Sequence, residues 1–167
     1  MTCVATTSPQ ALTTHRPIVD PPPSSELASR RMRNTRSRDT PPELAIRRLL
    51  RARGLRYRVD ARPVQGLNRR ADLVFGPARL AVFVDGCFWH SCPEHGSAPK
   101  ANRVWWAEKL RANVERDRDT NARLIAAGWT VLRIWEHMPP EAATEIVATT
   151  VAELRPRSTP RDHRSVT

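Results

Sequence analysis

The sequence is poor in lysine, cysteine and aromatic residues, and it has no long apolar run. Its 167 residues include three Cys and 5% aromatics, and the only lysines are Lys100 and Lys109. No apolar stretch approaches the roughly 20 residues that a membrane span needs, so we expect no membrane segment. The first twenty residues lack the charged start and apolar core of a secretory signal, which predicts a cytoplasmic protein. The length fits one domain with a single core.

Arginine supplies the charge that lysine does not. The formal net charge is +11, and residues 30–70 hold fourteen Arg against three acidic residues. The rest of the chain carries fourteen basic and fourteen acidic residues, so one quarter of the sequence holds the whole excess. Such asymmetry favours a polyanionic partner, most simply nucleic acid, over the alternative of a merely solvated arginine-rich surface.

Composition also divides the chain. Residues 1–27 are rich in Thr, Ser and Pro and show no hydrophobic period, and residues 155–167 have a similar composition. We expect both segments to be disordered tails flanking a folded domain over residues 28–154.

The folded part reads as helix, three strands, helix, strand and helix. Thr40 as N-cap, Pro41 at N1 and Glu43 at N3 predict a capping box that starts the first helix, and Gly54 fits just after its end. We expect strands over 57–59, 71–75, 80–84 and 129–135, and further helices over 103–127 and 141–154. The order predicts an α/β fold with a mixed sheet flanked by helices, in which 71–75 and 80–84 form a hairpin.

A cysteine and histidine set carries the first chemical signal. Cys87, Cys92 and His95 lie within nine residues, and His137 follows the last predicted strand. These four side chains can provide a tetrahedral zinc site if that strand ends beside the 87–95 loop. A disulfide between Cys87 and Cys92 is the alternative, but no export signal supports an oxidising compartment. His90 could also replace one of the ligands.

Two acidic residues carry the second signal. Asp72 lies near the start of an apolar strand, and Asp85 follows its hairpin partner. A buried Asp needs a partner cation, so Asp72 is the best candidate for a catalytic Mg²⁺ ligand. The alternative is that Asp72 bonds a nearby Arg such as Arg70. If His90 is free of zinc, it is a candidate general acid or base, although a surface His is the simpler interpretation.

Aromatic pairs carry a third signal. Phe88 and Trp89 lie in an irregular loop between the candidate metal ligands, and Trp105 and Trp106 begin the long helix. Aromatic wedges can open a duplex and stack on bases, while the alternative for such pairs is core packing.

Several runs are similar to those of the very short patch repair (Vsr) DNA mismatch endonucleases. They are SRDTPPE (37–43), RADLVF (70–75), VFVDGCFWHSCPEH (82–95) and WWAEKLRANVERDRDTNARLIAAGWTVLRIWEH (105–137). The resemblance covers about residues 28–154 in order. It implies a fold similar to PD-(D/E)xK restriction endonucleases, and a Mg²⁺-dependent enzyme that nicks one strand of double-stranded DNA 5′ to the thymine of a T:G mismatch left by deamination of 5-methylcytosine.

The resemblance also implies roles for single residues. Asp72 and the main-chain carbonyl of Val84 would bind Mg²⁺, His90 would assist attack by water, and Glu43 would lie near the active site. Asp85 stands where the best-known member has His, so it is a candidate further carboxylate at the metal, direct or through water. The zinc ligands would be Cys87, Cys92, His95 and His137.

DNA contacts follow from the same resemblance. Phe88, Trp89 and Trp106 would form an aromatic wedge beside the mismatch, and Met32, with Arg31 and Arg33, would belong to an N-terminal arm that wraps the duplex. We expect a monomer in a bacterial-type cytoplasm, associated with the nucleoid, with mismatch-repair proteins as candidate partners. Two alternatives remain: a zinc-stabilised DNA-binding module without catalysis, and a restriction-type nuclease that cuts both strands.

Overall fold

The computed structural model describes residues 38–97 and 99–155. The elements in these residues follow the predicted order: α2 (Pro41–Ala52), β1 (Arg58–Ala61), β2 (Ala71–Phe75), β3 (Leu80–Asp85), α3 (Arg103–Ala126), β4 (Thr130–Trp135) and α4 (Pro140–Leu154). The predicted tails, residues 1–27 and 155–167, lie outside the described residues except for Arg155, which follows the last helix as its C-cap. No helix in the described ranges is long and apolar enough to cross a membrane.

The sheet is mixed, as the sequence predicts. Its order is β1-β2-β3-β4. The β1–β2 and β2–β3 pairs are antiparallel, and the second pair is the predicted hairpin, closed by a turn in which Arg79 N–H donates to the Gly76 carbonyl at 3.0 Å. β4 pairs with β3 in parallel, and α3 is the crossover between them.

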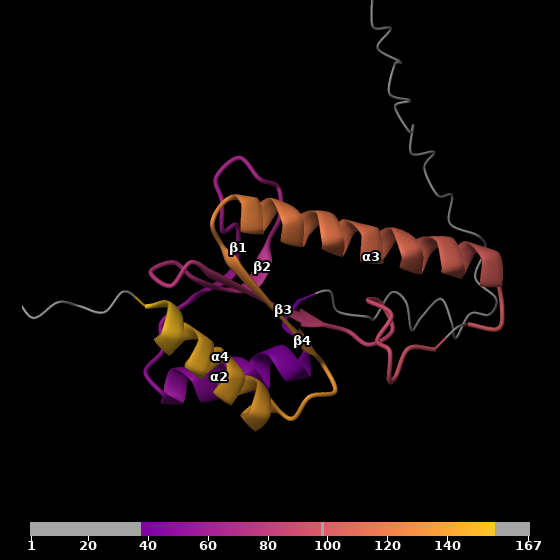
Figure 1. Cartoon of the computed structure of the whole chain (residues 1–167). Helices are drawn as coiled ribbons and strands as arrows, with labels where there is room; N and C mark the ends of the chain where they lie inside the picture. The colour runs from indigo at the N-terminus through magenta and orange to yellow at the C-terminus, as the bar shows by residue number, and fades with distance from the viewer. Residues whose placement is uncertain (1–37, 98, 156–167) are drawn as a thin grey trace, which may run out of the picture.

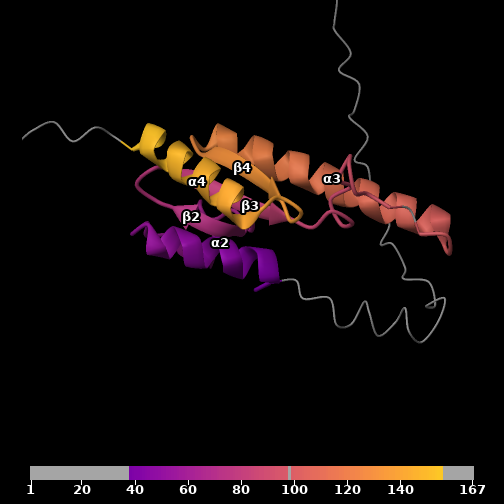
Figure 2. The ribbon, with the colours of Figure 1, turned by 90° about the horizontal axis from the view of Figure 1, so that it is seen from below.

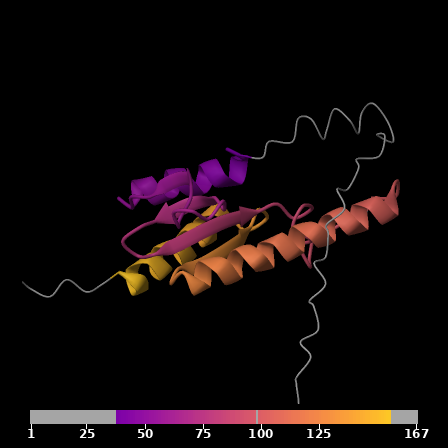
Figure 3. The same cartoon turned by 90° about the horizontal axis from the view of Figure 1, so that it is seen from above.

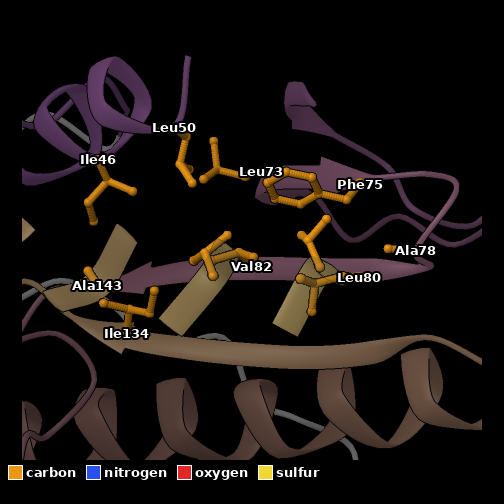
Figure 4. Close-up of a cluster of buried hydrophobic side chains, with 11 residues drawn as sticks. Ile46, Leu50, Leu73, Phe75, Ala78, Leu80, Val82, Ile134 and Ala143 are labelled. Atoms are coloured by element: carbon orange, nitrogen blue, oxygen red, sulfur yellow. The ribbon is translucent and has the colours of Figure 1, made fainter. Parts of the chain in front are cut away.

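Helices cover both faces of this sheet. Figure 1 shows α3 along one face and α2 with α4 on the other, and the views in Figures 2 and 3 agree. The larger core lies between α2, α4 and the sheet (Figure 4), where Ile46, Leu50, Leu73 and Phe75 are almost fully buried. A smaller core joins α3 to the other face through Leu124. Burial of each large side chain contributes about 1.5–3 kcal/mol, so the two layers fix the orientation of the strands.

The start of α2 confirms the positions of the predicted capping box and corrects its bonds. Thr40 is the N-cap, but its side chain does not cap a backbone N–H. Instead, the Thr40 hydroxyl donates to Glu43 Oε1 at 2.9 Å and Asp39 N–H donates to Glu43 Oε2 at 3.1 Å. At the other end of α2, Gly54 has φ +71°, as expected of a residue that follows a helix. Glu43 is thus drawn into a hydrogen-bonded group rather than a simple cap.

One edge of the sheet collects the candidate site residues. β2 begins at this edge, while β3 and β4 end there, since β3 is antiparallel to β2 and parallel to β4. Asp85 is level with Trp135 in the register, so the segments after β3 and β4 leave the sheet together. The parallel pairing therefore brings the 87–95 loop next to His137, as the predicted metal site requires.

Candidate active site and metal centre

Asp72 is a largely buried carboxylate that has no ion pair among the described residues. The other four residues of β2 are all buried, and Asp72 is largely buried with a minor part of its surface open to solvent. Its Oδ2 accepts a hydrogen bond from Val84 N–H at 2.7 Å. The pKa of Asp72 is raised to about 6, mainly by burial and also by the negative charges of Glu43 and Asp85. The hydrogen bond from the Val84 N–H and the positive charge of Arg47 act in the opposite direction and lower this pKa. A cation near Asp72 would offset this cost.

The Arg70 alternative for Asp72 is not what the structure shows. Arg70 Nε donates to Asp60 Oδ1 at 2.6 Å, and its Nη2 donates to the Asp60 carbonyl oxygen. Within residues 38–97 and 99–155, the structure gives Asp72 no ion pair of its own.

Glu43 lies close enough to Asp72 to raise the pKa of Asp72, but the Glu43 carboxylate is itself bonded to Arg47. Its Oε2 accepts from Arg47 Nη2 at 2.7 Å, and Arg47 Nη1 donates to Asp39 Oδ1 at 2.6 Å. The side chains of Glu43 and Arg47 are 5% and 10% exposed, so this is a buried ion pair. Its charges are compensated before any metal binds.

The negative charge of Asp85 is also balanced by an arginine, in this case Arg133. Both of its carboxylate oxygens accept from Arg133 Nη1, each at 2.8 Å, and the Asp85 side chain is 6% exposed. Arg133 comes from β4, the parallel neighbour of β3. The predicted contact of Asp85 with a metal remains untested, but in this structure its carboxylate faces an arginine.

His90 is held by a carboxylate that the sequence did not single out. His90 Nδ1 lies 2.6 Å from Asp117 Oδ2 and 3.7 Å from Asp85 Oδ1. Burial acts to lower the pKa of His90, but the hydrogen bond to Asp117 and the charges of Asp85 and Asp117 outweigh it and raise the pKa. Asp117 accepts from Arg133 Nη2 at 3.0 Å as well. Its pKa is lowered, since these contacts to His90 and Arg133 overcome the effect of burial. With ionised Asp117 on Nδ1, Nε2 is the ring nitrogen left for other chemistry.

The four predicted zinc ligands form one cluster. Their ligand atoms all lie within 4.8 Å of one another. The set is Cys87, Cys92, His95 and His137. His137 Nδ1 is 3.1 Å from Cys87 Sγ and 3.7 Å from Cys92 Sγ, and both cysteines are free thiols rather than a disulfide.

The donor set fits a metal ion of the zinc type. Burial and the neighbouring Cys92 thiol raise the pKa of Cys87 to about 11, so two sulfurs at this spacing need a positive partner in order to ionise. Glu94 Oε2 lies 3.6 Å from His137 Nε2, the nitrogen opposite the one near the sulfurs, as in carboxylate–histidine–zinc arrangements. Two sulfurs and two imidazoles are a common set of structural zinc ligands.

The candidate wedge residues lie together, with Phe88 and Trp89 in the 87–95 loop and Trp106 in the first turns of α3. Phe88, Trp89 and Trp106 have ring centroids 5.1–5.9 Å apart, and Trp105 packs on Trp106 at 4.7 Å. All four are half-buried, so they are neither core residues nor isolated surface rings. Asn113 Nδ2 of α3 donates to the Trp89 carbonyl at 3.0 Å and ties the loop to the helix. The predicted arm residues Met32, Arg31 and Arg33 lie outside the described residues.

Comparisons with known proteins agree with these features. A family model described as DNA mismatch endonuclease Vsr matches residues 24–94. The type II nicking enzyme V.NaeI of Lentzea aerocolonigenes is 46% identical over 136 residues, which cover 80% of this chain and 82% of that protein. The chain belongs to the Vsr family.

Two further relatives have the same kinds of name. The type II nicking enzyme V.XorIIP of Xanthomonas oryzae pv. oryzae is 40% identical over 107 residues, covering 63% of this chain and 76% of that protein. The DNA mismatch endonuclease Vsr of Escherichia coli K12 is 39% identical over 111 residues, covering 65% of this chain and 68% of that protein.

Two residues of this Vsr-family chain escaped sequence reasoning. Asp117 lies on α3 and Arg133 on β4, both beyond the part that the family model matches. A charged Arg133 between Leu132 and Ile134 in an apolar strand was the available signal, because a half-buried Arg in a strand needs a carboxylate partner. Asp117 carried no such signal among the many charges of its helix.

Proposed function

We propose that this member of the Vsr family is a Mg²⁺-dependent endonuclease that nicks one strand of double-stranded DNA 5′ to the thymine of a T:G mismatch, such as deamination of 5-methylcytosine leaves. The observation that carries the proposal is Asp72, a largely buried carboxylate with a raised pKa beside Glu43, Asp85 and the His90 network. The relatives support the reaction class, since their names describe nicking enzymes and a DNA mismatch endonuclease.

Asp72 and the main-chain carbonyl of Val84 would hold the Mg²⁺ ion. Both are hard oxygen donors, and Mg²⁺ is commonly bound by one or two carboxylates while it keeps several waters. The Val84 N–H already fixes the Asp72 carboxylate, which limits its side-chain freedom. When bound, Mg²⁺ would supply positive charge to the scissile phosphate.

His90 would move the proton of the attacking water. With Nδ1 bonded to Asp117, the ring is oriented and Nε2 can accept a proton. The raised pKa of His90 indicates that its surroundings stabilise the imidazolium that this step produces. Glu43, held by Arg47, would contribute negative charge near Asp72 rather than a direct contact.

The aromatic cluster would select the mismatch. Opening a duplex costs unstacking and unpairing free energy, and the cost is smaller at a mismatch than at a paired step. Phe88 and Trp89, which directly precede His90, and Trp106 of α3 form a cluster of half-buried rings that would serve as this wedge. We assign Met32, Arg31 and Arg33 to DNA binding on charge and resemblance, with salt-sensitive affinity as the expected sign of their phosphate contacts.

The cysteine and histidine cluster would hold a structural Zn²⁺. Its ligands bracket the Phe88, Trp89 and His90 loop on one side, and His137 anchors the other side to β4. A closed four-ligand site of this kind stabilises a fold without taking part in chemistry. The protein would act as a monomer in the cytoplasm near the nucleoid, and mismatch-repair proteins are its proposed further partners.

A nicking assay tests the proposal. Purified protein is incubated with strand-labelled T:G and T:A duplexes in Mg²⁺ or in EDTA. We expect a nick 5′ to the mismatched thymine only in the T:G duplex with Mg²⁺. Salt-sensitive binding without cleavage under any metal would instead support the zinc-stabilised binding module. Conversion of supercoiled plasmid to linear rather than nicked product would support the restriction-type nuclease.

Metal analysis tests the zinc assignment separately. Purified protein is expected to contain about one Zn per chain. Absence of zinc, together with free reaction of Cys87 and Cys92 with a thiol probe in the folded protein, would contradict it. The variant Cys3→Ser, which leaves the four ligands intact, is the matched control.

A further inference from the structure

We propose that Arg133 is a positioning residue. It holds Asp117 against His90, and it keeps the Asp85 carboxylate from replacing Asp117 as the hydrogen-bond partner of His90. The inference rests on the proposed function and deepens it. It assigns Asp85 to Arg133 rather than to the catalytic metal, and it concerns two residues, Arg133 and Asp117, that the resemblance did not bring forward.

Every nitrogen of the Arg133 side chain has a partner. Nη1 donates to both oxygens of Asp85 at 2.8 Å, and Nη2 donates to Asp117 Oδ1 at 3.0 Å. Nε donates to Asn121 Oδ1 at 3.1 Å. The guanidinium also stacks on Phe83, with Cζ 4.8 Å from the ring centroid. A planar fork bonded through all three of its nitrogens has one orientation, so it fixes both carboxylates relative to each other.

Two carboxylates, those of Asp117 and Asp85, lie near the same ring nitrogen of His90. Asp117 Oδ2 lies 2.6 Å from His90 Nδ1, and Asp85 Oδ1 lies 3.7 Å from the same atom. Both carboxylates are within reach of one ring nitrogen, but Arg133 occupies both oxygens of Asp85. Without Arg133, the buried Asp85 carboxylate would lose both of its arginine hydrogen bonds, and His90 Nδ1, 3.7 Å from Oδ1, would be the nearest nitrogen described for it. His90 would then be drawn from Asp117, and Nε2 would turn from its position.

Lysine cannot perform the same task. A lysine ammonium is a point charge on a flexible stem, whereas Arg133 reaches Asp85, Asp117 and Asn121 from three separate nitrogens in one plane. Arg133→Lys therefore keeps the charge and loses the geometry. This separates positioning from simple charge compensation.

Steady-state nicking of a T:G duplex by variants provides the first test. We expect Arg133→Met to lower kcat about 10–100-fold with little change in KM, because the loss is in orientation of His90 rather than in DNA binding. Arg133→Lys should recover less than half of the wild-type kcat. Adding Asp85→Asn to Arg133→Met should restore kcat at least about threefold, since the competing carboxylate is removed.

The matched control is Arg123→Met. Arg123 is an exposed arginine on α3 whose Nε donates to Asp119 Oδ1 at 2.7 Å, and it takes no part in the site. Equal kcat values for Arg133→Met and Arg123→Met would overturn the proposal. A loss in Asp85→Asn alone as large as in Arg133→Met would also overturn it, because Asp85 would then act directly.

A measurement that needs no nicking separates this inference from the proposed function. Long-range ¹H–¹⁵N NMR of the His90 ring reports the tautomer and the Nδ1 hydrogen bond. We expect the wild type and Arg123→Met to share one signature and Arg133→Met to lose it. An unchanged His90 signature in Arg133→Met overturns positioning even if nicking falls. If Arg133→Met changes the His90 signature while the wild-type protein nicks no duplex, positioning is supported and the proposed function is rejected.

Folding of the variants is checked by circular dichroism. If Arg133→Met does not fold, the comparison is made between Asp85→Asn and Asp85→Asn/Arg133→Met, which removes opposite charges together. The double variant should still show the lower kcat and the altered His90 signal, because Asp117 has lost its partner. Identical values in these two proteins would overturn the proposal.

Discussion

Asp72 and Asp85 lie at the same edge of the sheet, one near the start of β2 and the other at the end of β3. Asp85 is bonded through both oxygens to Arg133, whereas the contact described for Asp72 is a hydrogen bond from the Val84 N–H. Glu43, the third acid of this region, has Arg47. Among these three acids, Asp85 and Glu43 are bonded to arginines, whereas the described residues give Asp72 no arginine partner.

Asp72→Asn gives the largest expected effect. Asparagine keeps the acceptor for the Val84 N–H and removes the charge that would hold Mg²⁺. Because a bound metal contributes several kcal/mol of transition-state stabilisation, we expect nicking to fall by about 10³-fold or more. Single-turnover nicking at saturating protein measures it. Wild-type rates in this variant would mean that Asp72 and Asp85 do not differ in function.

Arg47→Met probes the compensated side of the comparison. It leaves Glu43 buried without its cation, and removal of one partner of a buried ion pair destabilises by about 3–5 kcal/mol. Chemical denaturation measures the free energy of unfolding. Adding Glu43→Gln should recover part of the loss, and a double variant no more stable than Arg47→Met would show that the pair is not the cause.

The stability of Asp72→Asn sharpens the comparison further. Folding raises the pKa of Asp72, so the folded state holds that proton more tightly than the unfolded state. The contribution of the protonated Asp72 to the free energy of unfolding is therefore fully present below pH about 4, and the wild-type protein loses it as the pH rises through about 6. In EDTA at pH 7.5, we expect Asp72→Asn to be more stable than the wild type by about 2–3 kcal/mol. Denaturation at pH 7.5 and 5.0 should show the difference narrow at the lower pH; an equal difference at both would contradict the raised pKa.

Arg53→Met gives the smallest expected effect. Arg53 Nη1 and Glu145 Oε2 are 2.6 Å apart, about as close as Arg47 and Glu43, but their side chains are 44% and 64% exposed. Exposed pairs contribute about 0–1 kcal/mol, so unfolding should change little. A loss as large as that of Arg47→Met would show that distance, and not burial, decides the value of these pairs.

Local patterns predicted the helices and strands and the residues of the cysteine and histidine cluster well. Apolar periodicity, with the Gly54 signal after the first helix, located each helix and strand to within a few residues. The four residues of that cluster followed from residue type and spacing, once the last strand was assumed to end beside the 87–95 loop. The parallel β3–β4 pair confirms that assumption.

Pairings across the sheet escaped prediction. Whether Asp72 or Asp85 would find an arginine depends on which side chains of other strands and helices face it. Arg70 is close to Asp72 in sequence but turns to Asp60, while Arg133 reaches Asp85 from 48 residues away. Sequence distance is a poor guide to such partners, because strand register and the rotation of α3 decide them.

The β3–β4 pairing also sets the order in which the molecule can become competent during synthesis. Asp72, Asp85 and His90 emerge from the ribosome before α3 and β4, yet Arg133 and His137 lie in and just after β4. A nascent chain that stops before β4 has the proposed catalytic residues without Arg133, which is proposed to align them, or His137, which completes the cysteine and histidine cluster. Nuclease competence therefore cannot precede β4, and it also awaits α4, which completes the larger core.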